Sequence, residues 1–205
     1  MFTGIVAAVG SITRVEPLGT DAGLRVLVEA PTLDLSDVLI GDSIAVQGAC
    51  MTVVALHPTG FAFDVSRESL AHTVGLDAPG RVNLEKAMRL GDRVGGHLVS
   101  GHVDGVGRVV RFEPAGESRL LEVEAPLAMA RYLAYKGSIT IDGVSLTVNR
   151  VTDLRQGCVV SINLVPHTLA ATTLQALVPG SRVNLEIDLI ARYLDRMRAV
   201  DAAAC

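Results

Sequence analysis

Apolar and polar residues alternate along six segments in the first half of the chain, a period of two that is typical of strands with one buried face. We expect these strands at residues 3–15, 24–29, 43–47, 50–57, 61–66 and 81–85. Glycines separate the segments, where they indicate turns or bulges. Only residues 32–39 and 68–72 have a helical pattern. The first half therefore predicts an all-β unit with little helix.

The second half repeats this order of segments. Four blocks match in register, namely residues 120–126 with 26–31, 143–148 with 48–53, 167–172 with 68–73, and 182–186 with 81–85. The second copy starts at a glycine-rich seam, where the run from Gly101 echoes the run from Gly4. Six short strands that bury one face favour a closed Greek-key barrel, because closure removes exposed edges. We expect an all-β fold of two tandem six-stranded barrels in residues 1–96 and 97–187.

The pattern becomes helical after the second barrel. Apolar residues then recur at steps of three and four, at Ile190, Tyr193, Leu194, Met197 and Val200. Asp188 is a candidate N-cap. This pattern predicts one C-terminal amphipathic helix over residues 188–205, which has no counterpart after the first copy. Its apolar stripe either packs back on the second barrel or joins neighbouring chains.

Composition and charge exclude several classes of function. The formal net charge of −4 and the dispersed Lys and Arg residues argue against a nucleic-acid surface. No apolar run is long enough to cross a bilayer and no signal peptide is evident, so we expect a cytoplasmic protein without membrane association. Cys50, Cys158 and Cys205 lack zinc-site or disulfide spacing and should be free thiols. No metal-binding or P-loop motif occurs.

Two polar pairs recur in equivalent strands and are candidates for ligand binding. Cys50 and Thr52 lie on one side of a strand in the first copy, and Ser145 and Thr147 do so in the second. Each pair follows a glycine, and such hydroxyl or thiol groups suit a polyhydroxylated chain or the imide edge of a heterocycle. Because Thr is a good strand residue, packing alone explains either copy, whereas the duplication favours two similar pockets.

The seam contains two histidines, His97 and His102, whose neutral imidazoles can donate or accept a proton near pH 7. The alternative interpretation is a linker followed by a barrel corner. Two further residues differ between the copies. Asp142 corresponds to Gln47, and Lys136 corresponds to Ile40. These differences indicate either two pockets with different roles or simply solvated turn residues.

Several runs together resemble one family. They are the opening Met-Phe-Thr-Gly-Ile-Val, the seam at residues 95–107, the runs at 135–137 and 141–148, and the doubled Arg-Val-Asn-Leu-Glu. Over essentially the whole chain they resemble riboflavin synthase of the alpha-chain type. The resemblance implies two lumazine-binding barrels, a C-terminal helix that gathers three chains into a homotrimer, and an active site between barrels of different chains. It also implies a possible association with lumazine synthase.

The activity implied by this resemblance is a dismutation without a cofactor. A four-carbon unit passes between two molecules of 6,7-dimethyl-8-ribityllumazine, which gives riboflavin and 5-amino-6-(ribitylamino)uracil. A duplicated pocket suits a reaction that uses one substrate twice. The alternative is a non-catalytic lumazine- or flavin-binding protein of the same fold, because a duplicated site can lose its chemistry.

The family's site residues carry over to two pockets. The first comprises Gly4, Ile5, Val6, Cys50, Met51, Thr52, Asp64, Val65, Ser66, Arg67, Glu68, Ser69, Gly101, His102 and Val103. The second comprises Lys136, Ser145, Leu146, Thr147, Val165, Pro166, His167, Thr168, Leu169 and Ala170. The chain departs from the family at Gln47, where Asn is usual, and in a shorter connection after Thr73.

The expected catalytic set is His102, Cys50, Ser145, Thr147 and Lys136. A lumazine methyl group conjugated to the ring is acidic, so a modest base suffices to form the carbanion. Our hypothesis is that His102, with Ser145 and Thr147 of a neighbouring chain, moves protons, while Cys50 or a water adds to the other ring. Which of these groups is the base and which the nucleophile is left open.

Overall fold

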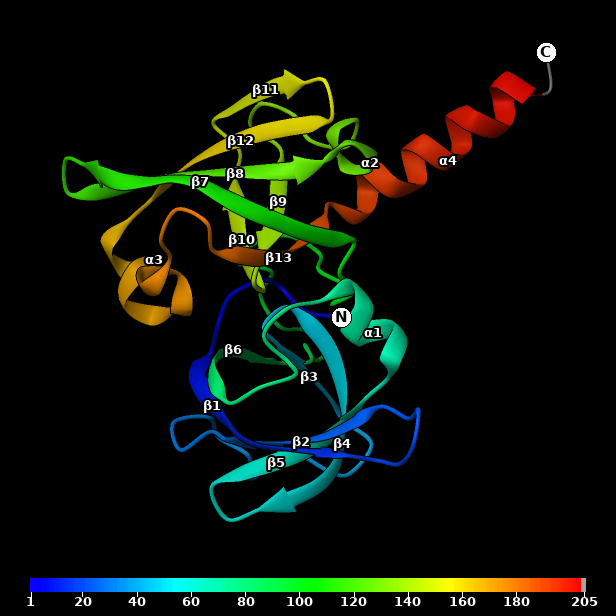
Figure 1. Cartoon of the computed structure of the whole chain (residues 1–205), viewed down its shortest axis with the longest axis vertical. Helices are drawn as coiled ribbons and strands as arrows, with labels where there is room; N and C mark the ends of the chain where they lie inside the picture. Colours follow the sequence, from blue (N-terminus) through cyan, green and yellow to red (C-terminus); the bar gives the residue numbers. More distant parts are fainter. Residues whose placement is uncertain (204–205) are drawn as a thin grey trace.

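The structure is a computed structural model that describes residues 1–203, with side chains to residue 199. Two β-barrels lie one above the other, and a helix projects from the second barrel (Figure 1). The N-terminus lies near the junction of the barrels. Cys205 and the side chain of Val200 lie outside the described part.

The first barrel consists of six antiparallel strands. They are β1 (Ala8–Pro17), β2 (Leu24–Glu29), β3 (Ser43–Val46), β4 (Ala49–His57), β5 (Gly60–Val65) and β6 (Gly80–Lys86). The barrel closes in the order β1-β2-β5-β4-β3-β6, in which β5 rather than β3 lies beside β2. This crossover gives the Greek-key arrangement expected from the sequence. One short helix, α1 (Arg67–His72), precedes β6.

The second barrel repeats this order with one strand interrupted. Its elements are β7 (Gly105–Ala115), β8 (Ser118–Pro126), α2 (Leu127–Ala130), β9 (Ser138–Ile141), β10 (Val144–Thr147), β11 (Arg150–Leu154), β12 (Gly157–Leu164), α3 (Pro166–Ala171), the 3-10 helix η1 (Thr173–Ala176) and β13 (Arg182–Ile187). The sheet order is β10-β9-β13-β7-β8-β12-β11. Strands β10 and β11 together correspond to β4, since Val148 N–H bonds to Gly137 and Asn149 N–H bonds to Ser161. The predicted pair of Greek-key barrels is confirmed.

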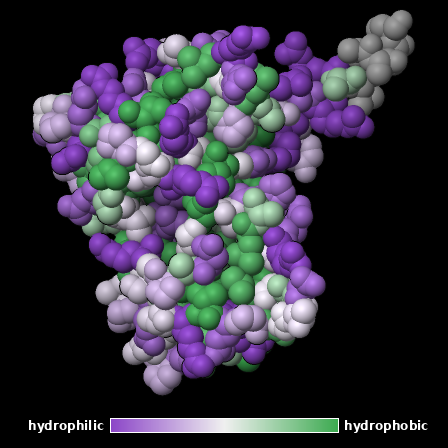
Figure 2. All heavy atoms as spheres, viewed as in Figure 1, coloured by the Kyte–Doolittle hydropathy of each residue, from purple (hydrophilic) through white to green (hydrophobic). Residues whose placement is uncertain are grey.

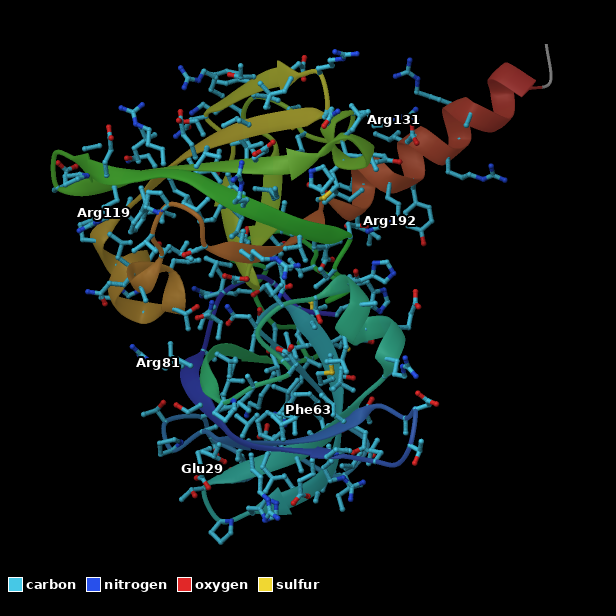
Figure 3. The ribbon with its side chains drawn as sticks, viewed as in Figure 1. Glu29, Phe63, Arg81, Arg119, Arg131 and Arg192 are labelled. Carbon is cyan, nitrogen blue, oxygen red and sulfur yellow. The ribbon has the colours of Figure 1, made fainter. Side chains whose placement is uncertain are left out.

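Each barrel buries its own apolar core. Phe61 and Phe63 are fully buried in the first barrel, and their ring centroids are 6.3 Å apart. Figure 3 shows Phe63 inside this barrel. Leu121 and Ile141 are fully buried in the second barrel. Burial of one such side chain contributes about 1.5–3 kcal/mol. The two main clusters have no residue in common, so each half is stabilised largely by its own strands.

The helix expected at residues 32–39 does not form, and that prediction is wrong. Leu33 N–H bonds to the carbonyl of Ala30, and Val38 N–H bonds to that of Leu35, which makes two separate turns. The carboxylate of Asp34 accepts the N–H of Ser36 at 3.0 Å. A short acidic side chain that binds nearby backbone in this way competes with helix formation.

The first strand begins at Ala8 rather than at Thr3. The N–H groups of Thr3 and Gly4 donate to the carboxylate of Glu85 at 2.7 and 3.0 Å, so they are not available to a sheet. Gly4 also has φ of +74°, a left-handed conformation that interrupts a strand. The opening segment is therefore held by the Glu85 side chain and by an isolated bridge between Phe2 and Val99, instead of by a continuous strand pairing.

Helix α4 (Leu189–Ala203) is the predicted C-terminal helix. Asp188 accepts the N–H of Ile190 at 3.0 Å, which confirms its capping role. Ion pairs join the root of the helix to the second barrel, Arg192 with Asp104 and Arg131 with Asp195; Figure 3 labels both arginines at the root. The rest of the helix stands clear of the barrels (Figure 2).

The apolar stripe of α4 does not pack back on the second barrel. Ile190, Tyr193, Leu194 and Met197 remain 63%, 64%, 56% and 63% exposed. The helix is therefore attached by charged groups at its base while its apolar residues face solvent within this chain. No helix in the described part of the chain is long and apolar enough to span a membrane.

Candidate functional site

The two barrels meet where two glycines approach each other. A Cβ on Gly48 would lie 2.6 Å from the nitrogen of Gly143, and a Cβ on Gly143 would lie 2.9 Å from the nitrogen of Gly48. Both glycines are left-handed, with φ of +86° and +81°. These reciprocal contacts define a pseudo-twofold axis between the halves, and the axis leaves no room for a side chain at either position.

The asparagines of the repeated Arg-Val-Asn-Leu-Glu run bind across this axis. The side-chain amide of Asn83 donates to the carbonyl of Asp142 at 2.9 Å, and that of Asn184 donates to the carbonyl of Gln47 at 2.9 Å. Gln47 and Asp142 have φ of +50° and +49°. The predicted correspondence of these two residues is confirmed, and both are interface residues rather than solvated turn residues.

The first candidate pocket wall lies on β4. Cys50 is partly exposed, and its N–H donates to the carbonyl of Gly101 at 2.7 Å. Thr52 lies on the same side of the strand and is exposed. Cys50 packs against a small cluster that contains Phe2 and Ala45. The thiol therefore has apolar neighbours.

The second candidate wall, on β10, has the same backbone contact but different neighbours. Ser145 N–H donates to the carbonyl of Gly4 at 2.8 Å. The Ser145 hydroxyl lies 2.7 Å from Nδ1 of His97, and Nε2 of His97 lies 3.3 Å from the hydroxyl of Thr140. Thr140 occupies the position of Ala45 in the strand pairing. The serine thus has an imidazole partner where the cysteine has apolar groups.

His97 reaches Ser145 because Gly96 precedes it. A Cβ on Gly96 would lie 2.7 Å from the Ser145 hydroxyl oxygen and 2.3 Å from the carbonyl oxygen of Thr3. Burial lowers the pKa of His97 below its usual 6.5, and the nearby Asp188 opposes this effect. The imidazole is therefore mostly neutral near pH 7 and can accept a proton on one nitrogen.

The opening residues of each half belong to the opposite barrel. Gly4 contacts Ser145, and Val6 packs against the core of the second barrel. Gly101 contacts Cys50, and Val103 packs against the core of the first barrel. Within the chain, Gly4 and Val6 therefore adjoin the second barrel and not the wall of Cys50, with which the sequence groups them, because the repeat exchanges these segments between the barrels.

Three residues of the expected pockets have core side chains. Met51 and Val65 are 5% and 1% exposed in the first core, and Leu146 is 8% exposed in the second. They alternate with outward-facing neighbours such as Thr52 and Thr147. Because side chains alternate between the faces of a strand, these three can offer a ligand only their backbone.

The helices α1 and α3 present the other expected pocket residues at the barrel ends. The hydroxyl of Ser66 caps α1 by accepting the N–H of Ser69 at 3.0 Å. Asp64 and Arg67 are engaged in ion pairs with Arg25 and Asp21. The exposed residues in this set are Asp64, Ser66, Arg67, Glu68, Val165, Pro166, His167 and Ala170, while Ser69, Thr168 and Leu169 are partly buried.

Lys136 and His102 are both exposed. Lys136 N–H bonds to the carbonyl of Val148, as Gly41 N–H bonds to that of Val53, so Lys136 corresponds to Gly41 and not to Ile40 as expected. It has φ of +62°, and its ammonium lies 3.0 Å from the side-chain oxygen of Asn149. The side chain of His102 makes no hydrogen bond with another residue of the described part.

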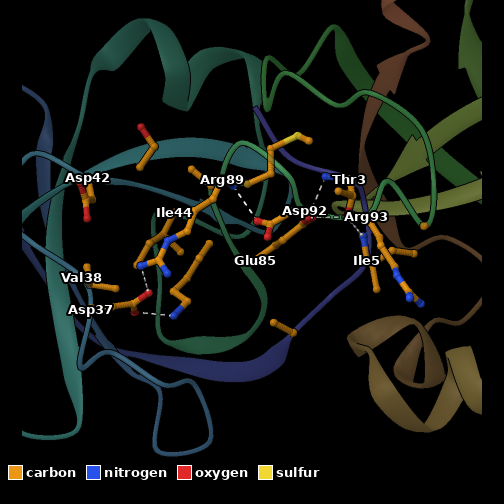
Figure 4. Close-up of a pocket in the computed structure, with 16 residues that line it drawn as sticks. Thr3, Ile5, Asp37, Val38, Asp42, Ile44, Glu85, Arg89, Asp92 and Arg93 are labelled. Carbon is orange, nitrogen blue, oxygen red and sulfur yellow. Dashed lines mark hydrogen bonds and ion pairs between the residues drawn. The ribbon is translucent and has the colours of Figure 1, made fainter.

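A cleft of about 800 Å³ lies beside the first barrel and is lined in part by Thr3, Ile5 and Glu85 (Figure 4). Neither Cys50 nor Ser145 lines it. It is bordered by the segment that links the barrels. Asp37 pairs there with Lys86 and Arg89, and Asp92 accepts the N–H of Arg89. Because Asp37, Lys86 and Arg89 pair with one another and neither candidate wall lines the cleft, we place the candidate site at the two pocket walls instead. No metal-binding cluster of His, Cys, Asp or Glu occurs among the described residues.

Sequence reasoning missed two features of the site. His97 is not among the site residues expected from the sequence, although its place in the glycine-rich seam is a signal for it. In the sequence, Glu85 and Glu186 are distinguished only as the ends of two repeated strands. Their role depends on contacts more than eighty residues away in the chain and has no local signature. Cys50 and Cys158 are free thiols, as predicted.

Comparison with known proteins agrees with this geometry. The model of the lumazine binding domain matches residues 3–87 and 100–188. The chain is 45% identical over 203 residues to riboflavin synthase of Photobacterium phosphoreum, which covers 98% of this chain and 90% of that protein. It is 44% identical over 200 residues to riboflavin synthase of Mycobacterium tuberculosis strain H37Rv. That alignment covers 96% of this chain and 98% of that protein.

Among solved structures, the chain resembles LumP bound to riboflavin, with a TM-score of 0.81 and 25% identity over 91% of this chain and 99% of that chain. It also resembles LumP bound to 6,7-dimethyl-8-(1'-D-ribityl) lumazine, with a TM-score of 0.77 and 26% identity. This match covers 91% of this chain and 98% of that chain. The two matched repeats coincide with the two barrels, and the identity to the named relatives extends over nearly the whole chain. The chain therefore belongs to the riboflavin synthase family of lumazine-binding proteins.

Proposed function

We propose that this protein catalyses the dismutation of 6,7-dimethyl-8-ribityllumazine. One molecule donates a four-carbon unit to a second, which yields riboflavin and 5-amino-6-(ribitylamino)uracil. The observation that carries this proposal is the pair of equivalent walls, Cys50 with Thr52 and Ser145 with Thr147, each beside a glycine carbonyl. A reaction that consumes two copies of one substrate requires two walls of the same shape.

Binding and orientation supply a large part of the acceleration in this proposal. The small polar side chains on each wall suit the ribityl hydroxyls and the imide edge of the ring. Two rings held face to face react as if within one molecule, which removes much of the entropic barrier. The pocket residues named from the family, including those on α1 and α3, complete each binding surface.

The two walls supply different chemistry. At the second wall, neutral His97 lies within hydrogen-bond distance of the Ser145 hydroxyl and can receive the proton that a lumazine methyl group loses. We propose that His102 and Thr147 assist this proton movement at a face shared between chains, and that Lys136 borders it. At the first wall, the Cys50 thiol or a water adds to the second ring and activates it.

The assembly that we propose is a homotrimer. The exposed residues Tyr193, Leu194 and Met197 of α4 offer an apolar surface for joining chains. Each active site would then lie between the first barrel of one chain and the second barrel of another. We also propose the boundaries 1–96, 97–187 and 188–205, a cytoplasmic location, and association with lumazine synthase.

Incubation of the purified protein with the lumazine tests the function directly. Growth of riboflavin fluorescence, with release of the diaminouracil in equal amount, is the expected result. Binding of lumazine without riboflavin formation would instead support the second candidate, a non-catalytic ligand-binding protein, which the likeness to ligand-bound LumP favours. Absence of both binding and turnover would contradict both functions.

A further inference from the structure

The carboxylate of Glu85 holds the opening segment of the chain. Its Oε1 accepts the N–H and the hydroxyl of Thr3, both at 2.7 Å, and its Oε2 accepts the N–H of Gly4 at 3.0 Å. Figure 4 shows Glu85 pointing at Thr3, with dashed lines joining them. One side chain therefore fixes two successive peptide groups.

Glu186 makes the same contacts in the second half. Its Oε1 accepts the N–H and the hydroxyl of Ser100, both at 2.7 Å, and its Oε2 accepts the N–H of Gly101 at 2.9 Å. Corresponding distances in the two copies differ by no more than 0.1 Å. Glu85 and Glu186 are the last residues of the two copies of Arg-Val-Asn-Leu-Glu. The repeated run therefore makes the same carboxylate contacts to an opening segment in both halves.

The glycine held by each carboxylate donates its carbonyl across the junction. Gly4 accepts the N–H of Ser145 at 2.8 Å, and Gly101 accepts the N–H of Cys50 at 2.7 Å. A Cβ on Gly4 would lie 2.6 Å from Cβ of Ser145, and a Cβ on Gly101 would lie 2.7 Å from Cβ of Cys50. Any shift of either glycine is therefore transmitted to the wall residue that it touches.

Both carboxylates are largely buried, and Glu85 also borders the cleft beside the first barrel. Glu85 is 8% exposed and Glu186 is 2% exposed. Burial raises the pKa of both groups, while their hydrogen bonds to the opening segments oppose that rise. A charged acceptor that binds three donors forms stronger hydrogen bonds than a neutral amide would. Neither carboxylate has a cationic side-chain partner among the described ion pairs, so the opening segments are their principal partners.

We propose that Glu85 and Glu186 are positioning residues, and that each sets the pocket wall of the opposite barrel. Glu85, from the first barrel, places Gly4 against Ser145 on the second. Glu186, from the second barrel, places Gly101 against Cys50 on the first. This inference rests on the proposed function for its catalytic readout. It predicts that damage to one glutamate affects one pocket and spares the other.

A pair of double-mutant cycles in the full chain tests this crossed dependence. In Glu85→Gln the amide nitrogen opposes the N–H of Gly4, so the segment shifts, and kcat should fall about 10- to 100-fold. Ser145→Ala should then cause less than about a twofold further loss, because its wall is already displaced. Cys50→Ala should still cause its full loss. In Glu186→Gln, Cys50→Ala should instead cause less than about a twofold further loss, and Ser145→Ala should cause its full loss.

Glu122→Gln is the matched control, since Glu122 is a buried carboxylate that binds Arg150 away from both walls. Its cycles with Ser145→Ala and Cys50→Ala should be additive. Thr3→Ser and Thr3→Val give a second test that leaves Glu85 in place, which decides the case if Glu85→Gln does not fold. The serine should keep near-normal kcat, and the valine should reproduce the pattern of Glu85→Gln.

Fluorescence titration with the lumazine separates this inference from the proposed function. The titration should resolve two lumazine-binding sites, one at each wall. Glu85→Gln should weaken binding at the same site that Ser145→Ala weakens, whether or not riboflavin forms. Equal loss at both sites, or additive cycles for both glutamates, would overturn the positioning role. Crossed effects on binding in a protein that makes no riboflavin would keep the positioning role while refuting the enzyme.

Discussion

Nδ1 of His97 lies 2.7 Å from the hydroxyl oxygen of Ser145, although the two residues are 48 positions apart in the chain. The other ring nitrogen lies 3.3 Å from the hydroxyl of Thr140, which fixes the orientation of the ring. The equivalent strand position in the first barrel is Ala45, so the first wall lacks this hydroxyl. The imidazole contact is therefore the clearest chemical difference between the duplicated walls.

Replacement of His97 should reduce proton transfer more than binding. His97→Gln retains a hydrogen-bonding group but cannot take up a proton, so we expect kcat to fall by about 100-fold or more, with a smaller change in KM. Burial lowers the pKa of His97 below 6.5, hence the neutral form persists as the pH falls through 6.5. The acidic limb of the kcat profile should accordingly lie below that pH in the wild type.

Stopped-flow measurement of riboflavin formation between pH 5 and pH 8 checks both expectations. His57→Gln is a suitable control, because His57 is an exposed residue at the end of β4. An unchanged kcat in His97→Gln would show that the contact with Ser145 only orients the strand.

The chain's own repetition allowed most of the fold to be predicted. The matched blocks fixed the strand order in both halves, and the paired Arg-Val-Asn-Leu-Glu runs occupy β6 and β13 as expected. The helix expected at residues 32–39 failed because the Asp34 side chain binds Ser36 N–H, which a hydrophobic period does not encode. The expected correspondence of Lys136 with Ile40 is wrong by one position, because both halves have a glycine nearby and only the backbone bond from Lys136 to Val148 identifies Gly41 as its counterpart.

The site was less predictable than the fold. The side-chain types of Cys50 and Ser145 and their place on equivalent strands follow from the sequence, since alternation puts both outside the core. The exchange of opening segments between the barrels does not follow from the sequence, because it depends on how the two barrels meet at Gly48 and Gly143. A glycine on each side of a junction is visible in the sequence, whereas the partner that it touches is not.

The stability of the barrel junction should depend on pH through Asp142. Burial raises the pKa of Asp142 to about 7 from an unfolded value of 3.8, against the opposing effects of Asn184 and Gln47. Between these two values the unfolded chain releases a proton that the folded chain retains. The free energy of unfolding therefore falls as the pH rises from about 4 to about 7, by about 4 kcal/mol if the full shift applies.

Thermal unfolding of wild type and Asp142→Asn across this pH range measures that contribution. Asparagine keeps an oxygen for the N–H of Asn184 and carries no titratable proton. The difference in stability between the two proteins should move in favour of the variant as the pH rises, and then level off above pH 7. A difference that stays constant from pH 4 to pH 8 would mean that Asp142 is ionised in the folded chain throughout.

Removal of α4 should separate the chains of the proposed trimer. Tyr193, Leu194 and Met197 are more than half exposed, so their stripe has no partner among the residues that the structure describes. Deletion of residues 188–205 should yield monomers that still bind lumazine and turn it over poorly, because each proposed active site needs barrels from two chains. Light scattering with parallel activity assays tests this, and Arg198→Ala is a control on the same helix. A truncated protein that stays trimeric, or that is fully active as a monomer, would contradict this role of the helix.

The two walls should be distinguishable by substitution, because their neighbours differ. Cys50 lies against Phe2 and Ala45, whereas Ser145 bonds to His97. Cys50→Ala and Ser145→Ala should each lower turnover about tenfold to several thousandfold, and ligand binding should weaken far less because backbone contacts remain. Cys50→Ser restores a polar atom at the first wall and should recover part of the loss.

The pH dependence of the two alanine variants then separates their roles. Ser145→Ala removes the hydroxyl partner of His97 and should alter the acidic limb of the kcat profile, while Cys50→Ala should leave that limb in place. Single-turnover traces with the lumazine give the rates of the chemical step for each variant. If both variants keep wild-type rates and His102→Gln alone is inactive, then the repeated position serves only packing. Proton transfer would in that case belong to the exposed histidine beside Gly101, and the contact between His97 and Ser145 would be structural.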